Sequence, residues 1–501
     1  MQKRPTGVSR RSFLESAALV TGLVQVGRAA IAQPAEDLHY MSVTEVASRI
    51  ESKEISPVEL TRAMLARIER IDGRLKSYAT VMADQALASA KARENEIQSG
   101  SYRGPLHGVP IAVKDLCFTK GVRTMGGAKV FADHVPSYDG TVVSRLQDVG
   151  AVLLGKLNLT EGAMAAYHPD FDVPVNPWDE DRWAGASSSG SGVATAAGLC
   201  FASLGSDTGG SIRFPAACNG VVGIKPTYGR VSRYGILALA ESLDHVGPFA
   251  RTSADAGIVL EAIAGHDGND PTSLTAPVPS MLDGIDGGIR GLRIGYDEAY
   301  ATEGIDEGLV ASIQEVLQLL ERLGARIVEV EVPDASDDDW WTLGSAEAAA
   351  THEANYPSRR DDYGPYLRDV LEQGAAVTGV QYAKAHKARL EFRGAFRAML
   401  RDVDVLACPS MSGPPLLAPP SRLYGSFAEI VSLFEGHDIT RFAGRFDFSG
   451  SPTISLPCGF SDEGLPYSVQ FVGHHLAEAL LCRIGHTYEQ ETHWHRRHPA
   501  V

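Results

Sequence analysis

Two clusters of serine and glycine, AGASSSGSG at residues 184–192 and GSDTGGSIRFP at residues 205–215, flank one short helix–strand unit. The alanine-rich segment between them predicts the helix, and residues 201–204 (FASL) predict the strand. Glycine lets a backbone turn tightly and approach a ligand closely. Consecutive N–H groups in such a turn can face one point and hold an anion, which a hydrolase needs for its oxyanion.

A third segment, GVPIAVKD at residues 108–115, places Lys114 at the end of an apolar strand. Burying an unpaired lysine is costly, and burial lowers the pKa of the amine by disfavouring its charged form. A neutral lysine is a competent general base. The chain contains no Gly-x-Ser-x-Gly elbow, no Walker A motif and no His-Glu-x-x-His. Lys114 is therefore the candidate base of a serine hydrolase.

The rest of the chain alternates between short apolar runs and helical patterns, which predicts an α/β architecture around one large, mostly buried sheet. Ser42 and Ser56 each open a capping box, and glycines 150 and 324 end helices. Two stretches, 265–291 and 409–426, are predicted either as parts of a lid or as plain surface connections. The expected strands are 109–113, 151–154, 201–204, 221–224, 326–332, 452–456 and 467–472, and the main expected helices are 83–97, 141–149, 306–323 and 476–490.

Together these segments resemble the amidase signature family over nearly the whole chain after its first 32 residues. The similarity extends to GKLN at 155–158, GIKPT at 223–227, LPCGF at 456–460 and QFVG at 470–473. It implies the amidase signature fold, a large central mixed β-sheet covered by helices on both faces. It also implies a single amidase domain over residues 33–501.

The resemblance assigns a role to each residue that matches a family motif. Lys114 matches the base, Ser211 the nucleophile and Ser187 the bridging serine, which the family holds on a cis peptide bond. Two positions depart from the usual family pattern, Ala186 in place of a glycine and Ser206 in place of a threonine, and Ala186 could narrow the backbone freedom beside Ser187. The implied oxyanion donors are the backbone N–H groups of Thr208, Gly209, Gly210 and Ser211, and the residues implied beside the substrate are Met125 and Gly126.

Other polar residues near these motifs are predicted to be structural. Asp207 and Arg213 are expected to form an ion pair or cap that stabilises the turn. His107 and Cys218 are expected to pack, since the implied triad uses neither. No metal-ligand spacing is present, and the resemblance implies no cofactor.

The implied reaction is hydrolysis of a small-molecule carboxylic amide through a Ser211 acyl-enzyme, with Ser187 relaying protons to Lys114. Three alternatives stay open. One is a hydrolase that prefers carbamates or esters. Another is the amidotransferase A-type subunit that acts on mischarged tRNA, and the third is a non-catalytic periplasmic binding protein. The resemblance also leaves a homodimer open.

Composition restricts the partners. The chain has 501 residues, 44% of them hydrophobic, and a net charge of −16, so it is expected to be globular and to repel nucleic acid. The six cysteines are scattered and form no Cys-x-x-Cys pair, which favours buried packing roles.

The N-terminus carries the pattern of an export signal. Residues 9–14 (SRRSFL) resemble a twin-arginine box, residues 17–26 form a short apolar run, and residues 30–32 (AIA) fit a cleavage site. The run is too short to anchor the chain stably in a membrane. Residues 1–32 are therefore predicted to be a twin-arginine signal peptide, cleaved near Ala32 to release a periplasmic or secreted enzyme. An ordinary basic N-terminal helix is the alternative.

Overall fold

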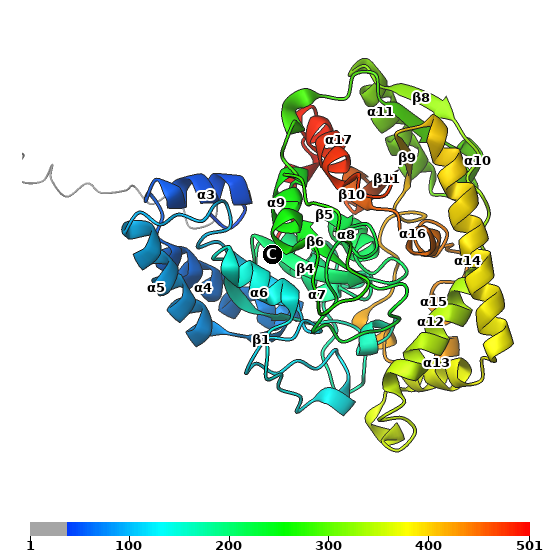
Figure 1. Cartoon of the computed structure of the whole chain (residues 1–501), viewed down its shortest axis with the longest axis horizontal. Helices are drawn as coiled ribbons and strands as arrows, with labels where there is room; N and C mark the ends of the chain where they lie inside the picture. Colours follow the sequence, from blue (N-terminus) through cyan, green and yellow to red (C-terminus); the bar gives the residue numbers. More distant parts are fainter. Residues whose placement is uncertain (1–37) are drawn as a thin grey trace, which may run out of the picture.

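The computed structural model describes residues 38–501, with elements numbered as in Figure 1. The predicted signal peptide, residues 1–32, lies outside the described residues. Among the residues described, no helix combines the length and apolar character needed to cross a membrane.

One sheet of eleven strands runs through the described chain in the order β1-β3-β2-β4-β6-β5-β10-β11-β9-β7-β8. Strand β2 pairs in parallel with β3 and β4, and β7 pairs in parallel with β8 and β9, whereas the other pairs are antiparallel. The sheet is therefore mixed, as expected. The strands are β1 (Tyr78–Val81), β2 (Pro110–Lys114), β3 (Val152–Leu157), β4 (Ala202–Asp207), β5 (Val222–Lys225), β6 (His245–Ala250), β7 (Arg293–Tyr296), β8 (Arg326–Glu329), β9 (Val405–Pro409), β10 (Thr453–Phe460) and β11 (Pro466–Gly473).

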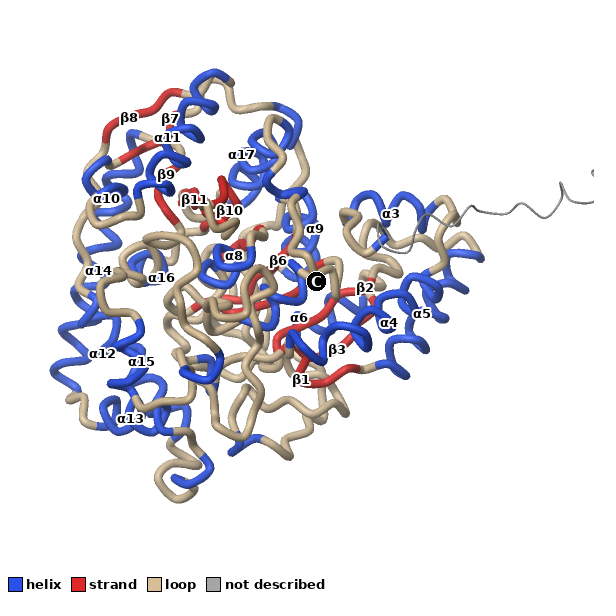
Figure 2. The backbone as a smooth tube through the Cα atoms, turned by 180° about the vertical axis from the view of Figure 1, so that it is seen from behind, coloured by secondary structure: helices blue, strands red, loops and turns tan. Residues whose placement is uncertain are grey.

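Helices cover both faces of this sheet, which confirms the predicted fold class (Figures 1 and 2). A further group, α12 to α15, packs mainly on itself beside the sheet at the lower right of Figure 1. The helices are α3 (Val43–Glu51), α4 (Pro57–Leu75), α5 (Ala83–Gln98), α6 (Thr141–Asp148), α7 (Ser189–Ala196), α8 (Arg213–Asn219), α9 (Ser253–Ile263), α10 (Glu298–Thr302), α11 (Glu307–Arg322), α12 (Asp337–His352), α13 (Pro365–Ala375), α14 (Gly379–Met399), α15 (Phe427–Leu433), α16 (Gly444–Ser449) and α17 (Glu478–Gln490).

The parallel pair β2 and β4 places two polar residues at one edge of the sheet. All residues of both strands are buried, as an apolar run between two covered faces requires. Ala112 pairs with Ser203 and Val113 with Leu204, so Lys114 ends β2 level with Gly205, and β4 continues two residues further to Asp207. In open α/β sheets ligands bind beyond the carboxyl ends of parallel strands.

The two capping boxes predicted at the starts of α3 and α4 are not both present. Ser42 forms a complete capping box with Glu45, as predicted. Ser56 accepts hydrogen bonds from the amides of Val58 and Glu59, but its hydroxyl contacts Glu94 instead. The second capping box is therefore only half formed, because a neighbouring helix supplies the carboxylate.

Candidate active site

Lys114 is completely buried at the end of β2, and three serine hydroxyls surround its amine. The distances from its Nζ are 2.7 Å to Ser187 Oγ, 2.8 Å to Ser188 Oγ and 2.9 Å to Ser206 Oγ. Ser188 Oγ donates its own hydrogen to the Ser206 carbonyl oxygen, so it can only accept from Lys114. The lone pair of a neutral amine is thereby left for Ser187 or Ser206.

Burial lowers the pKa of Lys114 to about 7, because the charged amine loses its hydration and no carboxylate among residues 38–501 contacts it directly. Two other buried lysines are held differently. Lys156 lies 3.3 Å from Asp115 and donates to Thr124 and a carbonyl oxygen, and Lys225 donates to two carbonyl oxygens. Among these three lysines only Lys114 contacts the serine clusters.

Ser187 and Ser211 lie on two loops that meet beside Lys114. The Ser188 amide donates to the Ser211 carbonyl oxygen at 3.3 Å, which joins the loop before α7 to the turn before α8. The Ala186–Ser187 peptide bond is cis, as the resemblance implied. Ser187 is fully buried, whereas Ser211 is partly exposed. In the described chain no hydrogen bond joins their two hydroxyls; such bonds commonly tighten only when substrate binds.

The turn from Asp207 to Arg213 is organised around the Asp207 carboxylate. It accepts hydrogen bonds from the amides of Gly210 at 2.6 Å and Ile212 at 2.9 Å, and from the Arg213 side chain. The Gly210 amide is therefore occupied. Within the described residues the amides of Thr208, Gly209 and Ser211 have no acceptor. Three of the four predicted oxyanion donors are thus free.

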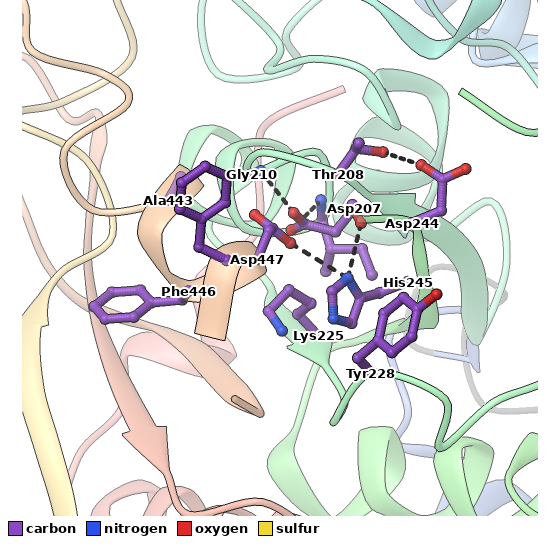
Figure 3. A network of polar contacts seen from close by, with 12 residues as sticks. Asp207, Thr208, Gly210, Lys225, Tyr228, Asp244, His245, Ala443, Phe446 and Asp447 are labelled. Atoms are coloured by element: carbon purple, nitrogen blue, oxygen red, sulfur yellow. Dashed lines mark hydrogen bonds and ion pairs between the residues drawn. The ribbon is translucent and has the colours of Figure 1, made fainter. Parts of the chain in front are cut away.

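Behind the turn lies a buried network of charged groups (Figure 3). Arg213 pairs with Asp207 at 2.8 Å and with Asp447 at 2.6 Å, and all three side chains are completely buried. Burial alone would raise the pKa of Asp207. The neighbouring Arg213 guanidinium outweighs this effect and holds that pKa below its ordinary value. Burial and the neighbouring Asp207 raise the pKa of Asp447 well above its ordinary value. The predicted structural ion pair between Asp207 and Arg213 is present. It stabilises the turn, and neither residue lines the cavity.

A cavity of about 330 Å³ opens over Ser211 and is mostly apolar. Thr208 and Gly209 line it beside Ser211, and α15 with the chain that follows it forms one side. Neither 265–291 nor 409–426 lines the cavity. Among the described lining residues Glu435, which is exposed, is the one charged group. The aromatic lining residues are Trp183, Phe214, Trp340, Trp341, Tyr366, Phe427 and Phe434.

Met125 and Gly126 lie outside the large cavity over Ser211, whereas the resemblance implied that they lie beside the substrate. Met125 is 5% exposed, its amide donates to Asp115, and it does not line the large cavity. Gly126 lines a neighbouring cavity of about 120 Å³, which shares the wall residue Ala163 with the large one. Neither residue contacts Lys114, Ser187 or Ser211 through a hydrogen bond in the described chain.

Comparison with known proteins decides the family. The model of the family described as Amidase matches residues 59–482. The chain belongs to the amidase family. It is accordingly a hydrolase of carbon–nitrogen bonds.

Several relatives share this family membership over nearly their full length. AmiD of Mycobacterium tuberculosis, named provisionally as an amidase, is 44% identical over 92% of this chain and 96% of its own. A relative from Moorella thermoacetica, the A-type subunit of glutamyl-tRNA(Gln) amidotransferase, is 39% identical over 93% of this chain and 99% of its own. The solved peptide amidase of Stenotrophomonas maltophilia superimposes with a TM-score of 0.80 at 31% identity, covering 92% of this chain and 98% of the other.

The structure adds residues to this amidase site that sequence reasoning missed. Ser188 and Ser206 both contact Lys114, although Ser206 was noted only as a departure from threonine. Asp447, through Arg213, and His245 support the turn from other segments, and distant aromatic side chains line the cavity. The run of three serines at 187–189 was the one sequence feature that could have indicated a role for Ser188 beside Lys114. His107 and the cysteines are structural, as expected: His107 contacts Glu96, and all six thiols are buried and free.

Proposed function

We propose that the chain hydrolyses a carboxylic amide through an acyl-enzyme on Ser211. The observation that carries the proposal is the buried Lys114, whose pKa is about 7 and whose amine contacts Ser187 beside the Ser211 turn. Ser211 Oγ forms a bond to the carbonyl carbon while its proton passes through Ser187 to Lys114. The proton then moves to the departing amine as the carbon–nitrogen bond breaks. Water, deprotonated by the same relay, releases the acid.

The amides of Thr208, Gly209 and Ser211 are the proposed oxyanion donors. None of them donates a hydrogen bond to another described residue, and all three residues line the cavity. The Gly210 amide belongs to the Asp207 contact instead. Donors that stabilise the developing negative charge are typically worth about 3 kcal/mol each.

Activity is expected to rise with pH and to level off above about pH 7. The reason is that Lys114 must be neutral to accept the Ser211 proton, and burial lowers its pKa to about 7. The measurement is kcat/KM of a neutral amide from pH 5 to 9, which should give an acid limb that depends on one proton. A profile with maximal activity at acid pH would contradict Lys114 as the base.

The preferred substrates are proposed to be amides that carry an apolar aromatic group. Burying a phenyl-sized group is worth about 1.5–3 kcal/mol, so kcat/KM should exceed that of a small aliphatic amide by about 10-fold or more. A para-carboxylate on the same ring should reverse the gain, because the walls are apolar and Glu435 is negative. A panel of matched amides, anilides, carbamates and esters measures this directly. Equal rates for para-methyl and para-carboxylate substrates would contradict the aromatic site.

A second candidate function is that of an amidotransferase A-type subunit, since the Moorella thermoacetica relative with that name is 39% identical. The apolar aromatic cavity favours a small-molecule amidase. The test is turnover by the purified chain alone, with aryl amides and with glutamine in the presence of mischarged tRNA. Activity that required the tRNA and partner subunits would support the amidotransferase.

Export by the twin-arginine route is also proposed, on the order of the paired arginines, the apolar run and the cleavage site in residues 1–32. The test is to fractionate cells and sequence the N-terminus of the protein in each fraction. A mature chain beginning near Gln33 outside the cytoplasm is expected, and changing Arg10 and Arg11 to lysine should retain uncleaved enzyme inside. A native protein that is wholly cytoplasmic and uncleaved would refute export.

A further inference from the structure

Trp340 of α12 contacts the oxyanion turn from outside the sequence motif. Its indole Nε1 donates a hydrogen bond to the carbonyl oxygen of Thr208 at 3.0 Å. Its ring also covers Gly209, where an added Cβ would lie 2.3 Å from the indole Cζ2. Trp340 is therefore fitted closely to the Thr208–Gly209 peptide group, and it lines the cavity above Ser211.

The hydrogen bond to Thr208 has a consequence for Gly209. In a trans peptide the C=O and the following N–H lie in one plane and point in opposite directions. The cis peptides of the described chain are at 186–187 and 356–357, so the Thr208–Gly209 bond is trans. Holding the Thr208 oxygen therefore orients the Gly209 N–H.

The other free amides of the turn are held by the same arrangement. The Gly210 carbonyl oxygen accepts from the Phe214 amide at 2.7 Å, which orients the N–H of Ser211. The Asp207 carbonyl oxygen lies 3.3 Å from His245 Nδ1, which orients the N–H of Thr208. The peptide group between Gly209 and Gly210 differs, because there the N–H is the group that is held, by the Asp207 carboxylate. Each free N–H is thus paired with an anchored carbonyl.

We propose that Trp340 is a positioning residue for the oxyanion hole, which aligns the Gly209 amide by holding the Thr208 carbonyl oxygen. This inference rests on the proposed acyl transfer. The three residues that hold these carbonyl oxygens lie on different elements. Phe214 belongs to α8 and His245 to β6, which both contact the sheet, whereas Trp340 belongs to α12 of the separate helical group. The helical group therefore contributes to the chemistry as well as to the cavity wall.

The test is Trp340→Phe, which removes the N–H donor and retains an aromatic ring over Gly209. Losing an oxyanion donor typically costs 100- to 1000-fold, so misaligning one is expected to lower kcat about 10-fold, with KM within about twofold. Trp178→Phe is the matched control. Trp178 also donates its indole N–H to a backbone carbonyl oxygen, that of Asn219 at 2.9 Å, but it does not line the cavity, so kcat should stay within about twofold.

An arylboronic acid distinguishes positioning from packing, because its tetrahedral adduct with Ser211 places an oxygen in the hole. In Trp340→Phe its inhibition constant should rise about as much as kcat falls, while the dissociation constant of the carboxylic acid product stays within about twofold. An unchanged kcat, or equal weakening of both ligands, would overturn the inference. If Trp340→Phe does not fold, the isosteric benzothienylalanine at position 340 removes the same N–H at constant shape, with the same expectations.

Failure of the proposed function gives a different result. If the parent enzyme turns over no amide, or if Ser211→Ala retains the parental rate, the acyl transfer itself is wrong and the inference falls with it. If the parent is active and Ser211→Ala is not, a normal Trp340→Phe enzyme overturns the role of Trp340 alone.

Discussion

Ser211→Ala is expected to abolish amide hydrolysis, with a loss of at least about 10⁴-fold in kcat. The side chain is the only proposed nucleophile, and the remaining oxyanion donors and cavity cannot form the acyl-enzyme. The fold should persist, because Ser211 is partly exposed and its carbonyl oxygen, not its hydroxyl, joins the two loops. The measurements are kcat with an aryl amide, labelling by a fluorophosphonate probe, and the melting temperature.

Two comparisons make the Ser211 result specific. Ser187→Ala should cost as much or less, since water can replace its hydroxyl in the relay, and it should still label slowly with the probe. A labelled parent and an unlabelled Ser211→Ala enzyme would exclude a non-catalytic binding protein. Residual activity within about 10-fold of the parent would refute Ser211 as the nucleophile.

Lys114→Met is expected to lower kcat about 10³-fold, which is the range of a lost general base. Methionine has a similar length and suits a buried site, so the change removes the amine without leaving a large void. The acid limb of the pH profile near pH 7 should disappear from the residual activity, because the group that titrates there is gone. Steady-state kinetics across pH 5 to 9 measure both effects.

Lys156→Met is the matched control, because Lys156 is also a completely buried lysine, on the neighbouring strand β3. It leaves Asp115 without its ion-pair partner, so the melting temperature should fall. The kcat of the folded enzyme should stay within a few-fold of the parent, and the acid limb should remain. A similar loss of kcat in both variants would mean that Lys114 serves structure alone.

Most strands that flank the site and the lysine that ends β2 were predictable from local patterns, whereas the roles of Ser187 and Ser211 came from the family resemblance. Apolar runs bounded by glycine indicated the strands that flank the site, and most expected strands are present within a few residues. Strands β1, β6, β7 and β9 were missed. Helices α12 and α14 were missed as well, because both are only weakly amphipathic and pack on one another, so no clear apolar stripe marks them.

The sequence by itself determined the chemical groups: a lysine ending an apolar strand and two serine–glycine clusters whose spacing matches one family. Only the tertiary structure decided how these groups are used. The pairing of β2 with β4 brings Lys114 to Ser206, and Asp207 occupies the Gly210 amide and leaves three others free. Most of the aromatic wall residues, Trp340 among them, reach the site from segments more than 100 residues away in the chain. Such contacts depend on long-range packing, which no local pattern of residues encodes.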